Sequence, residues 1–310
     1  MSASAFGELT VIVNPNAGGG AVREQVPALE EALAAHGLPY ELHLSGTASE
    51  ATRRARTALE AGGRYVVAVG GDGTVQAVLN GFFDDGHPLV EQPVLGVVGA
   101  GSGCDLLRTF GLPAGTEDAV SHLAGENVYP FDVMKVVTTG AGGERLTRYA
   151  HNLAEVGLGA SVTWRRRRLP AWTGRARDFL GFWIALASSR TSRVTVEADT
   201  KAYEGSAFNV VVANAQFTNG GLRLSPRSFP GDGILDVLVF TGPRSDALTM
   251  LPRIFRHGDH VPDPHIRELR AKIRVAVDAD RSLLVVADGN ELGRTPATFQ
   301  IVPRQVLLKL

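Results

Sequence analysis

Residues 65–81 read YVVAVGGDGTVQAVLNG, an apolar run followed by a glycine-rich turn and a second apolar stretch. We predict a buried strand over Tyr65–Val69, a loop at Gly70–Thr74 and a helix over Val75–Leu79. A strand that is apolar throughout is typical of a parallel sheet covered on both faces. This stretch therefore predicts an α/β domain with a binding loop at the carboxyl end of one of its strands.

The same alternation of strand, loop and helix surrounds this stretch. Short apolar runs predict further strands at Leu9–Val13, Tyr40–Leu44 and Val94–Val98. Glycine-rich loops follow two of these strands, at residues 14–20 and 99–103. Because the carboxyl ends of parallel strands lie at one edge of a sheet, we expect the three loops to meet there.

After about residue 127 the pattern changes to short strands joined by turns. We predict strands over residues 131–138, 148–155, 194–198, 208–214, 234–240 and 273–277, with one helical insert over residues 173–189. The chain therefore divides into an α/β domain over residues 1–130 and a mainly antiparallel, sandwich-like β domain over residues 131–310. The last strand is a candidate to return to the first domain.

Composition limits the classes of function. The 310 residues carry 31 basic and 32 acidic side chains, so a net charge of -1 argues against a nucleic-acid partner. The single cysteine, Cys104, rules out an internal disulfide and a multi-cysteine zinc site. No signal peptide and no apolar run of about 18 residues is visible, so we expect a cytoplasmic protein, at most peripheral at the inner membrane face.

Asp72 stands in the middle of the loop GGDGT at residues 70–74. Glycine loops at a helix N-terminus attract an anion, and the three loops together outline a phosphate-bearing nucleotide. A carboxylate would repel phosphate, so Asp72 fits better as a metal ligand or as the acceptor of a proton from an attacking hydroxyl. The alternative is that Asp72 is a helix cap. No Walker A loop and no GxGxxG spacing occurs.

Taken in order, NPNAGGG at 14–20, GGDGTVQAVLNG at 70–81, GAGSGCDLLRTFGLP at 99–113, NGGLRLSPRSFPGDGILDVLVF at 219–240 and VVADGN at 285–290 resemble the diacylglycerol kinase catalytic family. The likeness is to its soluble bacterial lipid kinases, which are related to sphingosine kinases. The resemblance implies a Rossmann-like N-terminal domain, a β-rich C-terminal domain and an active site in the cleft between them. It also implies transfer of the ATP γ-phosphate, with Mg2+, to a hydroxyl of diacylglycerol or a similar amphiphile.

The resemblance also implies roles for single residues. The positions that match the family's nucleotide-binding residues are Asn14, Gly70, Gly71, Asp72, Gly73, Thr74, Gly101, Ser102 and Asp105. Asp232 matches an aspartate that holds a structural Mg2+, helped by backbone carbonyls near Leu235.

Four positions depart from the family pattern. In the second loop, Gly99, Ser102 and Cys104 replace a proline, a threonine and an asparagine, and late in the chain Asn290 replaces a glutamate that helps to activate the hydroxyl. An asparagine cannot accept that proton. We therefore predict Asp72 as the base and Asp288 on the metal, with Glu291 as a candidate substitute for the missing glutamate.

A basic and aromatic insert lies in the second half of the chain. It includes Arg165, Arg166, Arg167, Arg168 and Trp172, followed by Phe179, Phe182, Trp183 and Leu186 at helical spacing. One interpretation is a surface that docks on anionic lipid headgroups; the other is a helix that packs its apolar stripe on its own domain. Two further hypotheses stay open: a kinase of a non-lipid hydrophobic alcohol, and a nucleotide- or lipid-binding protein without catalysis. A homodimer is compatible with either.

Overall fold

The computed structural model describes residues 4–99, 104–113, 115–169, 176–256 and 258–310. The chain forms two compact units. The N-terminal unit comprises residues 1–133 and 302–310, and the C-terminal unit comprises residues 134–301. Two long strands, β7 (Val128–Thr139) and β19 (Asn290–Lys309), contain the boundaries between them. The end of β19 thus belongs to the N-terminal unit.

The N-terminal unit is built on a parallel sheet with the order β19-β6-β3-β1-β2. Its other strands are β1 (Leu9–Val13), β2 (Tyr40–Leu44), β3 (Tyr65–Gly70) and β6 (Val94–Gly99), with a small hairpin of β4 (Phe83–Asp84) and β5 (His87–Pro88). Both β3 and β6 are buried along their whole length. The α/β prediction for this part of the chain is confirmed.

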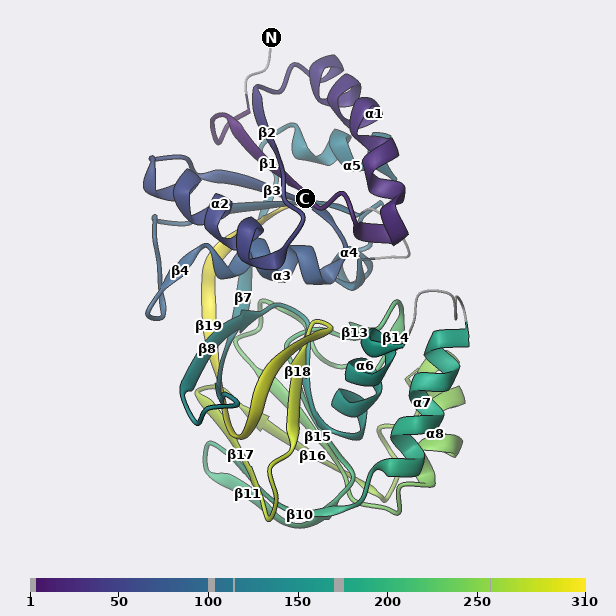
Figure 1. Cartoon of the computed structure of the whole chain (residues 1–310). Coiled ribbons are helices and arrows are strands. Elements are labelled where there is room, and N and C mark those ends of the chain that lie inside the picture. The colour runs from purple at the N-terminus through teal and green to yellow at the C-terminus, as the bar shows by residue number, and fades with distance from the viewer. Residues whose placement is uncertain (1–3, 100–103, 114, 170–175, 257) are drawn as a thin grey trace. The chain divides into compact units, whose positions relative to one another are not determined.

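Helices cover both faces of that sheet (Figure 1). They are η1 (Ala17–Gly20), α1 (Ala21–Ala35), α2 (Ala48–Glu60), α3 (Asp72–Asn80), α4 (Asp105–Phe110) and α5 (Thr116–Leu123). Leu29 and Leu33 of α1 pack with Val120 and Leu123 of α5 in one apolar core. The α2 and α3 helices also pack closely. A Cβ atom at Gly81, the residue after α3, would lie 2.4 Å from the backbone oxygen of Thr52 in α2, so only glycine fits there.

The C-terminal unit is an antiparallel β structure. Its strands are β8 (Arg145–Ala150), β9 (Leu153–Gly157), β10 (Ser192–Ala198), β11 (Lys201–Ala207), β12 (Asn209–Ala213), β13 (Phe217–Thr218), β14 (Leu222–Arg223), β15 (Leu235–Phe240), β16 (Ile266–Ala271), β17 (Arg274–Ala279) and β18 (Leu284–Ala287). One run has the order β16-β15-β12-β9-β18-β19, while β10 pairs with β11 and β17. The predicted mainly antiparallel, sandwich-like class is confirmed.

Alternation along the central strands builds two cores in this unit. On β12, Val210 and Val212 point into a core shared with β10 and β17, as expected for two facing β layers. Val211 lies on the other face, under α6 (Leu158–Arg168), α7 (Ala176–Ser188) and α8 (Asp246–Arg256). Figure 1 shows these three helices side by side along that face. Because both faces are covered, the strand reads as apolar throughout.

The structure differs from the sequence-based prediction in one strand and in two additional helices of the C-terminal unit. The predicted strand at residues 148–155 is two strands, β8 and β9, interrupted at His151–Asn152. The helical insert predicted at residues 173–189 is α7, and the sequence reading missed α6 before it and α8 later in the chain. No helix among the described residues is long and apolar enough to cross a membrane.

Candidate functional site

A side-chain hydrogen bond joins the segment after β1 to the first turn of α3. The amide Nδ2 of Asn14 donates to Oγ1 of Thr74 at 3.1 Å, and Oδ1 of Asn14 accepts from the backbone N–H of Asn16 at 3.0 Å. The strands are parallel neighbours, so their carboxyl ends bring these loops together. The structure thus places two of the predicted nucleotide-binding segments side by side.

Gly70 allows this close approach. A Cβ atom at residue 70 would lie 2.5 Å from Oγ1 and 2.9 Å from Cβ of Thr74, well inside van der Waals contact. The backbone φ of +155° is also one that side chains rarely adopt. A glycine is therefore required here for the chain to turn from β3 into α3 while keeping Thr74 against the end of the strand.

Asp72 begins α3 and reaches the start of a different helix. Its carboxylate accepts hydrogen bonds from the backbone N–H of Asp105, at 3.0 Å to each oxygen, and from that of Leu106 at 3.3 Å. These N–H groups are the first two of α4. The negative charge therefore lies at the positive end of α4, where it is stabilised. Asp72 therefore caps α4 and not the helix that follows its own strand, whose N-cap is Gly71.

The residues that start α4 support this arrangement. Sγ of Cys104 lies 3.6 Å from Oδ1 of Asp72 as a weak donor. Burial, followed by the negative charge of Asp72, raises the pKa of the Cys104 thiol well above its usual value, so the thiol stays protonated. Asp105 is buried and forms an ion pair with Arg108 one turn later. Gly101 and Ser102, both predicted to bind nucleotide, lie outside the described residues.

Asp288 lies in the tight turn between β18 and β19, with a positive φ of 46°. Its buried carboxylate accepts hydrogen bonds from the backbone N–H groups of His151 at 2.7 Å, Asn152 at 3.0 Å and Leu153 at 3.2 Å. Nδ1 of His151 is 2.9 Å from the same carboxylate. Asp288 thus holds the β8–β9 junction, which explains why the predicted single strand breaks there. Its assignment to a metal stays a prediction.

The neighbouring candidates lie differently. Asn290 pairs with Ala287 across the turn, and Glu291 is exposed on the next position of β19, so the two side chains alternate. Asp232 is exposed and accepts a hydrogen bond from the backbone N–H of Ile234, whereas Leu235 is buried in β15. Their roles stay predictions.

No group of three or more His, Cys, Asp or Glu side chains able to hold a metal ion occurs within the described ranges. A metal at Asp232 would need backbone carbonyls and water as its other ligands. The donor set seen here does not by itself fit a bound ion, so no step of the reaction is derived through one.

Sequence reasoning missed Glu155, in the middle of β9. Its side chain is buried on the face of the sheet under α6, against Gly159. Burial raises its pKa from 4.5 to about 7, and a hydrogen bond from the Asn209 side chain opposes part of that shift. The signal in the sequence was a single acid inside the apolar run LAEVG. Such buried and shifted carboxyl groups are enriched at functional sites.

Glu155 lines an apolar cavity of about 110 Å³ inside the C-terminal unit. Three further polar residues border it, Asn209, Thr218 and Asn219. The rest of the wall is apolar: Leu158, Gly159, Val162, Phe182, Phe208, Leu222, Leu224, Phe240, Ala247, Met250, Leu251 and Ile254. A cavity with a wall of this kind suits an apolar alkyl chain.

The basic insert has two faces. Phe182 and Leu186 pack against the core under α7, whereas Phe179 and Trp183 are 64% and 43% exposed. The guanidinium of Arg168 lies 3.8 Å from the centre of the Trp164 ring. Arg165 and Arg166 are half-buried, while the side chain of Arg167 and all of Trp172 lie outside the described residues. The membrane-docking hypothesis stays a prediction.

The chain thus combines a parallel α/β unit, with glycine-rich segments at the carboxyl ends of β1 and β3, and an antiparallel β unit. Residues 8–136 match the diacylglycerol kinase catalytic domain, and residues 152–309 match the YegS C-terminal NAD kinase beta sandwich-like domain. The chain belongs to the diacylglycerol kinase catalytic family and is a kinase that transfers phosphate to an alcohol group.

Individual relatives are distant but cover almost the whole chain. A diacylglycerol kinase of Bacillus subtilis is 25% identical over 96% of this chain and 94% of its own length. One of Mycobacterium tuberculosis is 26% identical over 96% of this chain and 93% of its own. A solved structure of a putative diacylglycerol kinase from Bacillus anthracis has a TM-score of 0.76 at 22% identity, covering 97% of this chain and 94% of that one. At 22% identity, the likeness to this solved structure supports the fold of the chain and no more.

Proposed function

We propose that this kinase uses MgATP to phosphorylate the hydroxyl of an amphiphile with an apolar chain, diacylglycerol being the first candidate. The observation that carries the acceptor class is the apolar cavity beside Glu155. A site for a sugar or another polar alcohol would instead be lined mainly by polar side chains, whereas most of this wall is apolar. The family's name supports the same class, because the relatives from Bacillus subtilis and Mycobacterium tuberculosis are diacylglycerol kinases.

The N-terminal unit supplies the proposed nucleotide site. The loops held by Asn14 and Thr74 lie where α3 begins, and the N-terminus of a helix favours phosphate. Magnesium would enter as part of MgATP, as a component of the substrate, and would neutralise charge on the phosphates. Gly101 and Ser102 remain proposed members of this site.

The reaction we propose is a direct transfer. The acceptor oxygen forms a bond with the γ-phosphorus, the bond from that phosphorus to the bridging oxygen of the β-phosphate breaks, and ADP leaves. The acceptor's proton passes to the carboxylate of Asp72. The hydrogen bonds from α4 hold this carboxylate in one orientation while it is ionised. Asn290 cannot take the proton, and Asp288 is engaged with backbone amides.

A second candidate function is a kinase of a smaller hydrophobic alcohol. The cavity of about 110 Å³ is small beside the roughly 300–1,000 Å³ typical of ligand sites, so it favours a single short chain over two long ones. The exposed Phe179 and Trp183 favour the lipid instead, because they would contact a membrane surface.

The test is a transfer assay with labelled ATP and Mg2+ against diacylglycerol, monoacylglycerol, a medium-chain alcohol and glycerol. We expect labelled product from an acceptor with an apolar chain and none from glycerol. Product from glycerol at an equal rate would refute an apolar acceptor. A medium-chain alcohol as the only acceptor would select the second candidate.

A further inference from the structure

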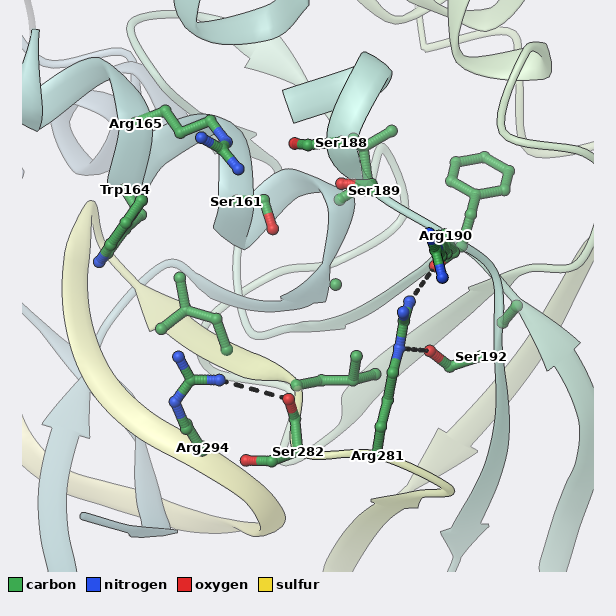
Figure 2. Close-up of a pocket in the computed structure, with 16 residues that line it drawn as sticks. Ser161, Trp164, Arg165, Ser188, Ser189, Arg190, Ser192, Arg281, Ser282 and Arg294 are labelled. Atoms are coloured by element: carbon green, nitrogen blue, oxygen red, sulfur yellow. Dashed lines mark hydrogen bonds between the residues drawn. The ribbon is translucent and has the colours of Figure 1, made fainter. Parts of the chain in front are cut away.

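A second cavity of the C-terminal unit, of about 290 Å³, is lined by four arginines and no acidic residue. The arginines come from four elements that are far apart in the sequence. Arg165 belongs to α6, Arg190 follows α7, Arg281 lies between β17 and β18, and Arg294 belongs to β19. Figure 2 shows them around one hollow, together with several serines. The cavity therefore concentrates four positive charges in a protein whose net charge is only -1.

The hydrogen bonds of these arginines hold them in place without neutralising them. Nε of Arg281 donates to Oγ of Ser192 at 2.6 Å, and its Nη2 donates to the carbonyl of Arg190. Nη1 of Arg294 donates to the carbonyl of Ser282 at 3.3 Å (Figure 2). All of these acceptors are uncharged, so the positive charges remain available to a ligand.

Arg165 gives the strongest indication that the cavity binds an anion. Its Nε is buried and has no hydrogen-bond partner among the described residues. Among the residues that the structure describes, no ion pair joins any of the four arginines to a carboxylate. A buried N–H of a charged group without an acceptor is costly, and an anion in the cavity would remove that cost.

The remaining polar wall suits a phosphate group. Hydroxyls of Ser161, Ser189 and Ser282 line the cavity beside the guanidinium groups, whereas the hydroxyl of Ser188 donates to backbone carbonyls of its own helix. Guanidinium forks and hydroxyls together form the charge-assisted hydrogen bonds that phosphate oxygens accept. The volume is at the lower end for ligand sites, which favours one phosphate with a small substituent. Two aromatic side chains of the wall, Trp164 and Phe208, could pack against such a substituent.

This cavity is distinct from the one beside Glu155. The two share only Leu158 and Phe208 in their walls, and different residues of α6 face each: Ser161 and Arg165 here, Val162 there. We propose that the arginine cavity binds a phosphate-bearing anion, either a small soluble phosphate ester or the phosphate of a lipid headgroup. It is a second ligand site, separate from the proposed acceptor site, and it does not depend on the proposed reaction.

The experiment compares the whole wild-type chain with Arg165→Gln, Arg281→Gln and Arg294→Gln. Arg145→Gln is the matched control, because Arg145 is an exposed arginine of β8 outside the cavity. Glycerol 3-phosphate and inorganic phosphate probe the soluble source by calorimetry. Phosphatidylcholine vesicles with and without phosphatidic acid probe the lipid source by flotation. Circular dichroism confirms that each variant is folded.

We expect each cavity variant to weaken binding of at least one phosphate probe by about tenfold or more, and Arg145→Gln to bind like the wild type. A loss confined to glycerol 3-phosphate and inorganic phosphate identifies a soluble ester. A loss confined to phosphatidic acid vesicles identifies a lipid headgroup. The proposal is overturned if the folded cavity variants bind every probe like the wild type, or if Arg145→Gln loses as much affinity as they do. Failure of the transfer assay above would leave this result unaffected.

Discussion

Both carboxylate oxygens of Asp72 lie 3.0 Å from the backbone N–H of Asp105, the first residue of α4. A residue that starts one helix thereby caps another that begins 33 positions later in the chain. The contact holds the carboxylate in one orientation. The structural role as a cap and the proposed catalytic role as a base are therefore compatible in one side chain.

Replacing Asp72 should separate these two roles. In Asp72→Asn the amide keeps one oxygen for the N–H groups of α4, so we expect a stability loss of only about 1 kcal/mol in urea unfolding. The proton acceptor is lost, so phosphate transfer should fall by about 100-fold or more. Initial rates with labelled ATP measure this. Turnover near that of the wild type would remove Asp72 from the proposed mechanism.

Glu155 should make the stability of the protein depend on pH. Its pKa is about 7 in the folded chain and 4.5 in the unfolded chain, so folding binds the proton. The contribution of Glu155 to stability is therefore largest below pH 4.5 and is lost as the pH rises toward 7, by about 3 kcal/mol in all. Glu155→Gln should lack this loss and be the more stable protein at pH 8. Urea unfolding at pH 5, 6, 7 and 8 checks it; parallel curves for the two proteins would show that Glu155 does not titrate in this range.

Gly159 should be intolerant of a side chain because of Glu155. A Cβ atom at residue 159 would lie 1.8 Å from Oε1 of Glu155. We expect Gly159→Ala to destabilise the chain by about 1–2 kcal/mol, although alanine is the better helix former. In the background of Glu155→Ala the clash is gone, so the same substitution should be neutral or stabilising. Equal effects in the two backgrounds would contradict the contact.

Asp288 and Glu291 should differ sharply in their effect on stability. Asp288→Asn disturbs a buried carboxylate that three backbone N–H groups share, so we expect a loss of about 2–4 kcal/mol in urea unfolding. The control Glu291→Gln changes an exposed side chain and should stay within about 0.5 kcal/mol. Equal stability of the two variants would argue that Asp288 is not a structural anchor.

The sequence by itself determined the local elements and the two fold classes. Apolar runs such as Tyr65–Val69 depend on near neighbours, so their periodicity identified β3 and α3. The predicted loop at Gly70–Thr74 was too long, because β3 continues to Gly70 and α3 begins at Asp72. Motif order was enough to place the chain in its family, which the comparisons then confirmed. Helices α6 and α8 were missed because the strand signals around them were stronger.

Only the tertiary structure decided which distant side chains meet. Nothing near Asp72 in the sequence indicates that it caps α4, and nothing near Glu155 shows that helices cover its strand. The arginine cavity gathers Arg165 and Arg294 from opposite ends of the C-terminal unit's sequence. Strand pairing and helix packing set these distances, and both depend on burial shared between segments far apart in the chain. Local sequence patterns therefore do not predict which distant segments are buried against each other.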